Sequence, residues 1–384
     1  MTYLDYNSTT PVDERVLKEM LPFFSEHFGN ASSNTHALGW YASGAIDKAR
    51  QQVADFISAE TSEIIFTSGA TESINMSLKG VYEAYQTKGN HIITCKTEHK
   101  AVLDTCAYLE EKGATITYLN VDREGRIDLD DLKNSFTDKT ILVCIMAANN
   151  ETGVLQDVEK LAQITHENNA IFMSDTTQVA GKLPIDVNDM GIDICCISTH
   201  KMYGPKGVGA LYVRRKNPRV NMIPLFHGGQ HESGKRSGTL NVTGIVGLGK
   251  ACEIAKTEYW DINMHVSKLR GFLEHQLLEI PGLLINGSTR HRLYNTSNLY
   301  FPKLKDGSAI FSHIKNNFAV SLGSACTSAN SEPSHVLNSM GLSMEESKNC
   351  IRFSFGKRNT MKEVEELAAI ILGLYDLKLV TKSM

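Results

Sequence analysis

Short apolar runs that end in polar residues recur along the first two thirds of the chain. They read EIIFTSGAT, HIITCKTEH, ILVCIMAANNETG, AIFMSDTTQ and DICCISTHK. Short runs rich in Ile, Val, Phe and Cys are typical of strands that are buried on both faces. Helical patterns lie between them, in ESINMSLKGVYEAY, AVLDTCAYLEEKG and VEKLAQITHENN. This alternation predicts an α/β fold, with a mostly parallel sheet flanked by helices.

The pattern changes after the run GALYVRR. A loop, HGGQHESGKRSGT, leads into a predicted long helix, NVTGIVGLGKACEIAKTEY. From about residue 260 the chain is typical of a smaller α+β unit, with a helix from His265 to Glu279. Apolar segments follow in NTSNLYF and CIRFSF, and the amphipathic stretch MKEVEELAAIILGLYDL predicts a final helix. No linker or internal repeat separates the two parts.

Polar residues follow each predicted strand of the first part. Parallel strands point their carboxyl ends at one edge of a sheet, and ligands of open α/β sheets bind at that edge. The residues expected there are Thr71, Glu72, Glu98, His99, Asn149, Asn150, Asp175, Gln178, Ser198, His200 and Lys201. This edge is therefore where we expect the chemistry of the protein.

Composition narrows the class of protein. The 384 residues are 42% hydrophobic and 21% charged, with a formal net charge of −4. These values exclude disordered and low-complexity classes and suit two or three globular domains. No basic block supports nucleic-acid binding, and no apolar run is long enough to span a bilayer. The first residues lack a signal-peptide pattern, so we expect a cytoplasmic protein.

The eight cysteines form neither a CxxC pair nor a cluster with zinc spacing, so no metal site is expected. Structural disulfides are rare in the cytosol, and most of these residues should be small buried hydrophobes. Cys326 differs because its surroundings, GSACTSANSEP, are small and polar. We expect it in a loop, where nearby cations or proton acceptors favour a reactive thiolate.

Lys201 and Asp175 each follow a predicted buried strand. A lysine at a strand end can form a Schiff base with an aldehyde cofactor, although alone it is more often a solvated loop residue. A carboxylate at the end of a buried strand is costly unless paired, and pyridoxal phosphate needs an acid to keep its pyridine nitrogen protonated. Gln178 can donate to the phenolic oxygen of the ring. The alternatives are a helix cap for Asp175 and a surface amide for Gln178.

The stretch SGATES opens a predicted helix directly after a strand. Free N–H groups and the helix dipole favour a phosphate there, with hydroxyls from Thr71 and Ser198 and the ring of His200. The alternative is N-capping by Ser68 or Thr71. His99 can stack on the cofactor ring and move protons, or it can be a capping residue.

With these residues in view, the chain resembles the pyridoxal-phosphate-dependent cysteine desulfurases of the NifS/IscS-like group, fold-type I enzymes of the class V aminotransferase family. The motifs are LDYNSTTP, GNASSNTHALGW, FTSGATESIN, TEHKAV, NNETGVLQD, SDTTQVAGKLPID, STHKMYGPKG, KRSGT, GSACTSA and IRFSFG. They run nearly from end to end. The resemblance implies a homodimer with a large cofactor domain, residues 16–259. Residues 1–15 and 260–384 would form a small domain that carries the catalytic cysteine loop.

The resemblance also implies a role for each matching residue. Lys201 would bind the cofactor covalently, with Asp175 at the pyridine nitrogen, Gln178 at the phenolic oxygen and His99 stacked on the ring. The phosphate would contact Ala70, Thr71, Ser198, His200 and, from the other subunit, Thr239. Asn150 and Arg352 would hold the substrate carboxylate, although a strand-end salt bridge is an alternative for Arg352. Cys326 would carry the persulfide.

The implied reaction converts L-cysteine to L-alanine and passes the sulfur to an acceptor protein for iron–sulfur cluster assembly or for tRNA or cofactor thiolation. The other readings are a selenocysteine lyase, a related aminotransferase and an inactive scaffold. Two features depart from the family pattern. Residues 228–232 read GGQHE in place of GGGQE, and Ser8 stands where alanine is common. The chain also ends at DLKLVTKSM, without the extension that scaffold partners use in some relatives.

Overall fold

A seven-stranded sheet forms the centre of the larger part of the molecule. The computed structural model describes residues 1–302, 308–322 and 333–376. The strand order is β2 (Ile64–Thr67), β8 (Gly209–Val213), β7 (Ile194–Ser198), β6 (Ile171–Asp175), β5 (Thr140–Cys144), β3 (His91–Cys95) and β4 (Thr115–Leu119). Only β8 runs antiparallel to its neighbours within this sheet. The predicted α/β fold with a mostly parallel sheet is confirmed, and β4 is a strand that the sequence pattern did not reveal.

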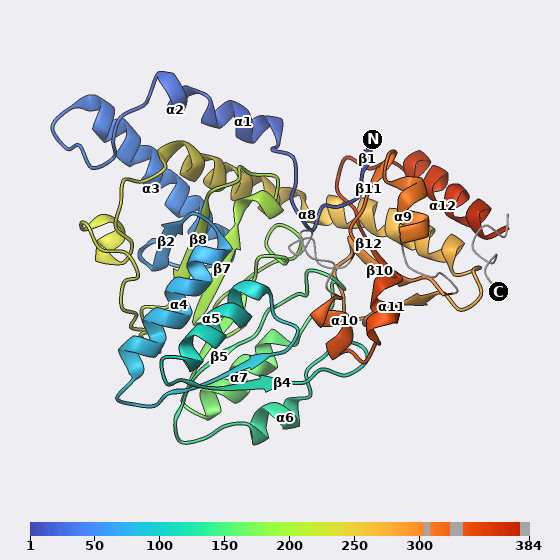
Figure 1. The fold of residues 1–384 in the computed structure, drawn as a ribbon. Helices are drawn as coiled ribbons and strands as arrows, with labels where there is room; N and C mark the ends of the chain where they lie inside the picture. Colours follow the sequence, from blue (N-terminus) through green and yellow to red (C-terminus); the bar gives the residue numbers. More distant parts are fainter. Residues whose placement is uncertain (303–307, 323–332, 377–384) are drawn as a thin grey trace.

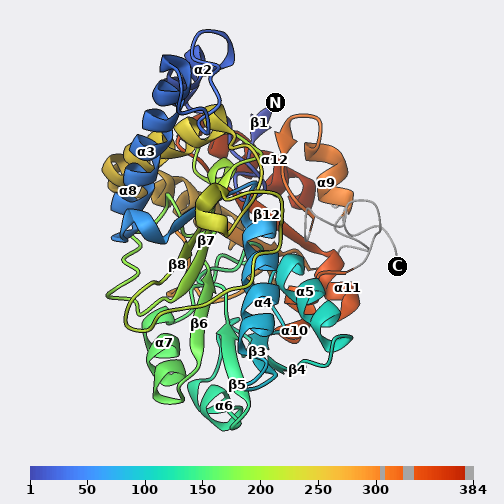
Figure 2. The same ribbon diagram turned by 90° about the vertical axis from the view of Figure 1, so that its left-hand side faces the viewer.

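Helices cover both faces of this sheet (Figures 1 and 2). Successive strand residues point to opposite faces, so Ile65 packs with α4 (Ala70–Tyr85) and α5 (Lys100–Glu110) on one side. Ile64 and Phe66 pack on the other side with α1 (Glu14–Met20), α3 (Ala37–Ile57) and α7 (Val158–Glu167). The double covering explains why the strands are apolar throughout.

The helix α8 (Val242–Leu277) is 36 residues long and passes from the large sheet to the smaller lobe (Figure 1). The expected separate helix starting at about His265 is therefore wrong, because one helix continues through this stretch. The connecting stretch KTEYWDINMH contains neither glycine nor proline, so nothing in it ends a helix. Its first half packs on α3 and its second half on α12 (Met361–Asp376).

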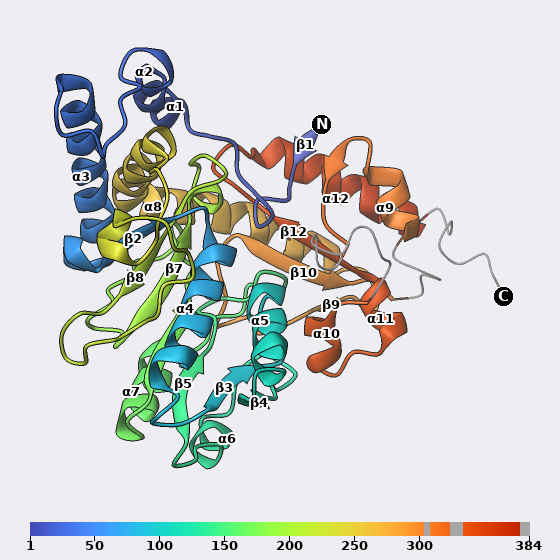
Figure 3. The ribbon, with the colours of Figure 1, turned by 60° about the vertical axis from the view of Figure 1, so that its left-hand side comes forward.

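The smaller lobe is built around a three-stranded antiparallel sheet of β12 (Cys350–Ser354), β10 (Thr296–Tyr300) and β9 (Leu284–Ile285) (Figure 3). At the start of the chain, β1 (Thr2–Tyr3) pairs in parallel with β11 (Phe318–Ala319). Leu4 therefore belongs to the same apolar cluster as Val266, Phe353 and Ile371. The segment after β1 then runs to the edge of the large sheet, where residues 7–9 meet Lys201.

Shorter helices complete the described structure. They are α2 (Pro22–Ser25), α6 (Leu129–Asn134), α9 (Ser308–Ile314), α10 (His335–Ser339), α11 (Met344–Lys348) and the 3-10 turns η1 (Thr61–Glu63), η2 (Thr199–Lys201) and η3 (His231–Gly234). Within the described ranges, no helix combines the length and the apolar character needed to cross a bilayer.

Candidate active site

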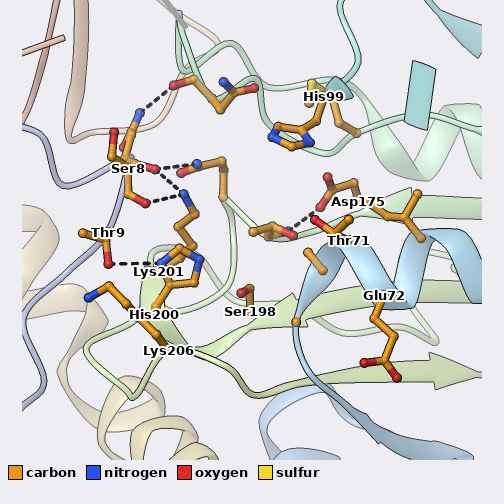
Figure 4. A pocket seen from close by; sticks show the side chains of 18 of the residues that line it. Ser8, Thr9, Thr71, Glu72, His99, Asp175, Ser198, His200, Lys201 and Lys206 are labelled. Atoms are coloured by element: carbon orange, nitrogen blue, oxygen red, sulfur yellow. Dashed lines mark hydrogen bonds between the residues drawn. The ribbon is translucent and has the colours of Figure 1, made fainter. Parts of the chain in front are cut away.

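A cavity of about 560 Å³ lies beside the carboxyl ends of β6 and β7, at the start of α4 (Figure 4). This volume falls within the usual range for small-molecule sites. Ten predicted site residues line it: Ala70, Thr71, His99, Asn150, Asp175, Gln178, Ser198, His200, Lys201 and Arg352. Thr239 is not among the lining residues, and Cys326 lies outside the described part of the chain.

Lys201 ends the 3-10 turn that follows β7. Its Nζ donates to the backbone carbonyls of Asn7, at 2.6 Å, and Ser8, at 2.8 Å. Both carbonyls come from the N-terminal segment, which the sequence analysis did not place at the site. The motif LDYNSTTP was visible, but only the tertiary structure brings it to the end of a strand far along the chain.

Asp175 is the last residue of β6 and is buried. Its Oδ1 accepts a hydrogen bond from the backbone N–H of Thr177, at 2.9 Å, and one from the thiol of Cys196, at 3.2 Å. Asp175 therefore caps the following turn, as the alternative interpretation expected, and it also lines the cavity. A carboxylate fixed in this way suits a partner that carries a proton on a ring nitrogen.

The turn before α4 is free of a side-chain cap. Gly69 is the N-cap, with φ 147°, so neither the Ser68 nor the Thr71 hydroxyl has the capping role considered above. A Cβ at Gly209 would lie 2.7 Å from the Cα of Gly69, so glycine permits β8 to approach this turn. The result is a helix N-terminus that opens onto the cavity at Ala70 and Thr71, which favours an anion.

His200 and Lys206 line the cavity near this turn. Burial, together with the charges of Lys201, Lys206 and Lys182, lowers the pKa of His200 to about 4. The ring is therefore neutral at physiological pH, and its Nδ1 lies 3.1 Å from the Thr9 hydroxyl (Figure 4). Residues 200–206 therefore contribute a neutral imidazole and two lysines to the cavity, and no acidic side chain.

His99 both caps a helix and lines the cavity. It is the N-cap of α5, and its Nδ1 accepts the backbone N–H of Ala101 at 3.1 Å. The ring is thereby fixed in orientation, as a stacking residue requires.

Two residues expected at the strand ends do not line the cavity. Glu98 is buried, its Oε1 accepts the N–H of Met146 at 2.7 Å, and burial raises its pKa well above the usual value. The Asn149 side chain binds the carbonyl of Thr97 and the N–H groups of its own turn. Both residues shape the edge of the sheet.

Arg352, on β12, is buried and brings the smaller lobe to the cavity. Its Nη1 donates to the carbonyl of Asn150 at 2.9 Å, and its Nη2 donates to Asp5 Oδ1 at 2.6 Å and to the Ser8 hydroxyl at 2.9 Å. The salt bridge considered as an alternative is therefore present, with Asp5, while Arg352 itself also lines the cavity. Ser8, one of the departures from the family pattern, accepts a hydrogen bond from the same nitrogen.

The loop with the GGQHE departure is attached to the large sheet through Glu232. This buried carboxylate pairs with Arg50, at 2.7 Å, and accepts the N–H of Phe66 on β2, also at 2.7 Å. His231, the histidine that is not found in the usual GGGQE motif, forms a hydrogen bond within this loop: its Nδ1 accepts the N–H of Gly238 at 3.3 Å. Thr239 follows and is exposed.

The seven cysteines of the described residues are all buried, as predicted, and none forms a disulfide. Burial raises the pKa of each thiol, so they stay protonated. Cys196 has an additional contact, the hydrogen bond to Asp175. The sequence predicts only packing for this residue, because a strand cysteine gives no local signal of such a partner.

These groups fit pyridoxal phosphate. A primary amine on Lys201, a buried carboxylate on Asp175 and a primary amide on Gln178 border one cavity, and a helix N-terminus without a side-chain cap opens onto the same cavity. An aldehyde, a protonated ring nitrogen, a phenolic oxygen and a phosphate are the complementary groups of that cofactor.

Comparison with known proteins gives the same result over nearly the whole chain. The model of the family "Aminotransferase class-V" matches residues 2–367. The cysteine desulfurase IscS of Anaeromyxobacter sp. (strain Fw109-5) is 50% identical over 371 residues, which cover 96% of this chain and 91% of that protein.

Solved structures agree. A NifS-like protein is 39% identical with a TM-score of 0.91, covering 98% of this chain and 99% of that chain. SspA, solved in complex with cysteine, is 36% identical with a TM-score of 0.82, covering 94% of this chain and 100% of that chain. The chain therefore belongs to the class V aminotransferase family and, within it, to the pyridoxal-phosphate-dependent cysteine desulfurases.

Proposed function

We propose that the enzyme converts L-cysteine to L-alanine and keeps the sulfur as a persulfide on Cys326 until an acceptor protein takes it. The observation that carries this proposal is the meeting of Lys201, Asp175 and Arg352 around one cavity. Each comes from a different segment, and the groups that complement them are an aldehyde, a ring nitrogen and a substrate carboxylate. A related structure, SspA, was solved with cysteine bound.

Pyridoxal phosphate, when bound, supplies an aldehyde for amines and a ring that accepts the electrons released when a proton leaves the Cα of the substrate. Lys201 would hold that aldehyde through its side-chain amine, and the same amine would take and return the Cα proton of the substrate. Asp175 holds a proton at the pyridine nitrogen, and His99 stacks on the ring and moves protons.

Arg352 and Asn150 orient the substrate through its carboxylate. The guanidinium group is buried and already held by Asp5, Ser8 and the Asn150 carbonyl, so its donors are fixed before the substrate arrives. A fixed fork binds a carboxylate at two points. The amino acid is thus anchored with its Cα toward Lys201.

The Cys326 thiolate then attacks the substrate sulfur. A bond forms between Sγ and that sulfur as the bond from sulfur to Cβ breaks, and the remaining three-carbon skeleton is protonated and leaves as alanine. Both described flanks of residues 323–332 are attached beside the cavity. Ser321 pairs with the backbone of Arg352, and His335 Nε2 lies 3.0 Å from the carbonyl of Glu98, next to His99.

A homodimer completes the proposed site, with Thr239 reaching the phosphate of the partner subunit. Thr239 is exposed and lies outside the cavity lining of its own chain. Large apolar side chains are also exposed on α2, on α3 and between them, namely Phe24, Phe28, Trp40 and Tyr41. A second copy would cover such a surface.

The proposed domain division separates the apolar clusters on the two faces of the large sheet from the cluster of the smaller lobe. Residues 16–259 form the cofactor domain, and residues 1–15 and 260–384 form the small domain, with α8 continuous across the boundary. The free state of the seven described cysteines supports a reducing, cytoplasmic location. We propose that the acceptor is a scaffold protein or a tRNA-thiolation enzyme.

The test is the product balance of the purified holoenzyme with L-cysteine, a thiol reductant and no keto acid. Alanine and sulfide in equal amounts are expected, whereas an aminotransferase forms neither without a keto acid. Cys326→Ala should keep the bound cofactor and bind cysteine yet release little sulfide, while the buried control Cys252→Ala stays active. Normal sulfide output from Cys326→Ala contradicts the persulfide role and favours a lyase that acts on selenocysteine.

A further inference from the structure

A second lysine lies behind Lys201 and was not singled out by the sequence. Lys182 follows β6 by seven residues and is buried. Lysine is almost never fully buried unless it is paired. The charged group that acts on it here is another cation, Lys201, and not a carboxylate.

The partners of Lys182 belong to a single residue. Its Nζ donates to the backbone carbonyl of Gln178 at 2.9 Å and to the side-chain Oε1 of the same residue at 3.3 Å. A neutral amine has two N–H donors, which these two acceptors match. Burial, with the charge of Lys201 in addition, lowers the pKa of Lys182 to about 7, so the neutral form is available at physiological pH.

These contacts determine the orientation of the Gln178 amide. A primary amide has an oxygen that only accepts and a nitrogen that only donates. With Oε1 turned to Lys182, the Nε2 donates to the carbonyl of Asn7 at 3.0 Å, on the side where Gln178 lines the cavity. The Asn7 carbonyl also accepts from Lys201. A continuous chain of hydrogen bonds thus joins Lys182, Gln178, Asn7 and Lys201.

We propose that Lys182 is a positioning residue, which holds Gln178 so that its amide nitrogen, and not its oxygen, faces the phenolic oxygen of the cofactor. This inference rests on the proposed role of Gln178. With the amide reversed, its oxygen would face an electron-rich oxygen and repel it. Lys182 therefore acts on the cofactor through Gln178 without touching it.

The experiment compares four holoenzymes: wild type, Lys182→Met, Gln178→Met and the double variant. The readouts are the absorption spectrum of the bound cofactor and the rate at which it is lost. Loss of one hydrogen bond predicts a roughly threefold to tenfold faster loss of cofactor in Lys182→Met. Its spectral shift should resemble that of Gln178→Met, and the double variant should show no further change.

Additive changes in the double variant, or an unchanged spectrum in Lys182→Met, overturn the inference. Lys133→Met, an exposed change on α6, is the matched control and should behave as wild type. Alanine formation by the wild-type enzyme distinguishes failure of the proposed function from failure of the proposal for Lys182. If the wild-type enzyme forms no alanine, the proposed function is wrong. If it forms alanine but the spectral changes of the variants are additive, only the role of Lys182 is wrong.

A further variant keeps Lys182 in place, in case Lys182→Met does not fold. In Gln178→Glu the carboxylate accepts from Lys182 but donates nothing to the cofactor. Its spectrum should match that of Gln178→Met, while its melting temperature stays at or above that of Gln178→Met because the two groups pair. A melting temperature well below that of Gln178→Met shows an unpaired buried carboxylate and overturns the inference.

Discussion

The thiol of Cys196 donates a hydrogen bond to Oδ1 of Asp175, over 3.2 Å. Burial, followed by the charge of Asp175, raises the pKa of this thiol well above its usual value, so it remains a donor at any physiological pH. Two donors, this thiol and the N–H of Thr177, therefore fix the position of the carboxylate oxygen Oδ1. A cysteine that the sequence assigns to packing thus supports the residue proposed to protonate the cofactor ring.

Removal of the Cys196 thiol should lower the affinity of the protein for its cofactor. In Cys196→Ala we expect cofactor loss to be roughly threefold to tenfold faster, whereas Cys196→Ser retains a donor at the same position and should stay close to wild type. Dialysis followed by absorption measurement checks this. Equal behaviour of the alanine and serine variants would show that the thiol only fills space.

Substrate affinity should depend on Arg352 and, to a smaller extent, on Ser8. Arg352→Lys keeps the charge but loses the planar fork, so the KM for cysteine should rise about tenfold to hundredfold while kcat changes less. Ser8→Ala removes one acceptor of Nη2 and should raise KM by roughly threefold to tenfold. Steady-state alanine formation gives both constants. A fall in kcat at constant KM for either variant contradicts the anchoring role.

Covalent attachment of the cofactor should require Lys201. Borohydride treatment of the wild-type holoenzyme should fix the cofactor to the peptide that contains this residue, which mass spectrometry can identify. In Lys201→Ala no peptide should be labelled, and alanine formation should fall by roughly 10²-fold to 10⁴-fold or more. Labelling of a different lysine in the variant, such as Lys182 or Lys206, would assign the attachment elsewhere.

Mixed dimers can show whether Thr239 acts in its own subunit or in its partner. One chain carries Lys201→Ala together with Thr239→Val, and the other is wild type. If Thr239 reaches across, the one remaining active site contains the valine, and its cofactor should bind about tenfold to hundredfold more weakly. If Thr239 acts within its own chain, that site is wild type throughout. Fluorescence titration of the separated mixed dimer distinguishes the two results.

Stability should depend on pH through His166 and Asp193. The hydrogen bond to Asp193, at 2.8 Å, raises the pKa of His166 against the opposing effects of burial and Arg214. A pKa raised on folding stabilises the protein most below the unfolded value, and this contribution disappears as pH rises through the folded pKa. His166→Gln should therefore lower the melting temperature more at pH 6 than at pH 9. His275→Gln, exposed on α8, should show no such difference.

Much of the large sheet is predictable from local pattern. Strands such as β6 and β7 are buried on both faces, so their apolar runs mark them directly, and the polar residues that follow reach the same edge. The sequence pattern wrongly predicted two helices where α8 is a single one. The hydrophobic and polar pattern changes near residue 260, but without glycine or proline this change does not end the helix. It also failed to reveal β4, whose exposed and half-buried residues give a weak apolar signal.

The sequence by itself determined the fold class and the polar residues that follow the strands of the large sheet, because strand ends and residue types are local properties. The tertiary structure alone decided which distant groups complete them. It brought Asn7 and Ser8 to Lys201, Arg352 from the smaller lobe to the Asn150 carbonyl, and Lys182 to Gln178. These contacts depend on chain packing over long sequence separations, for which no local pattern carries a signal.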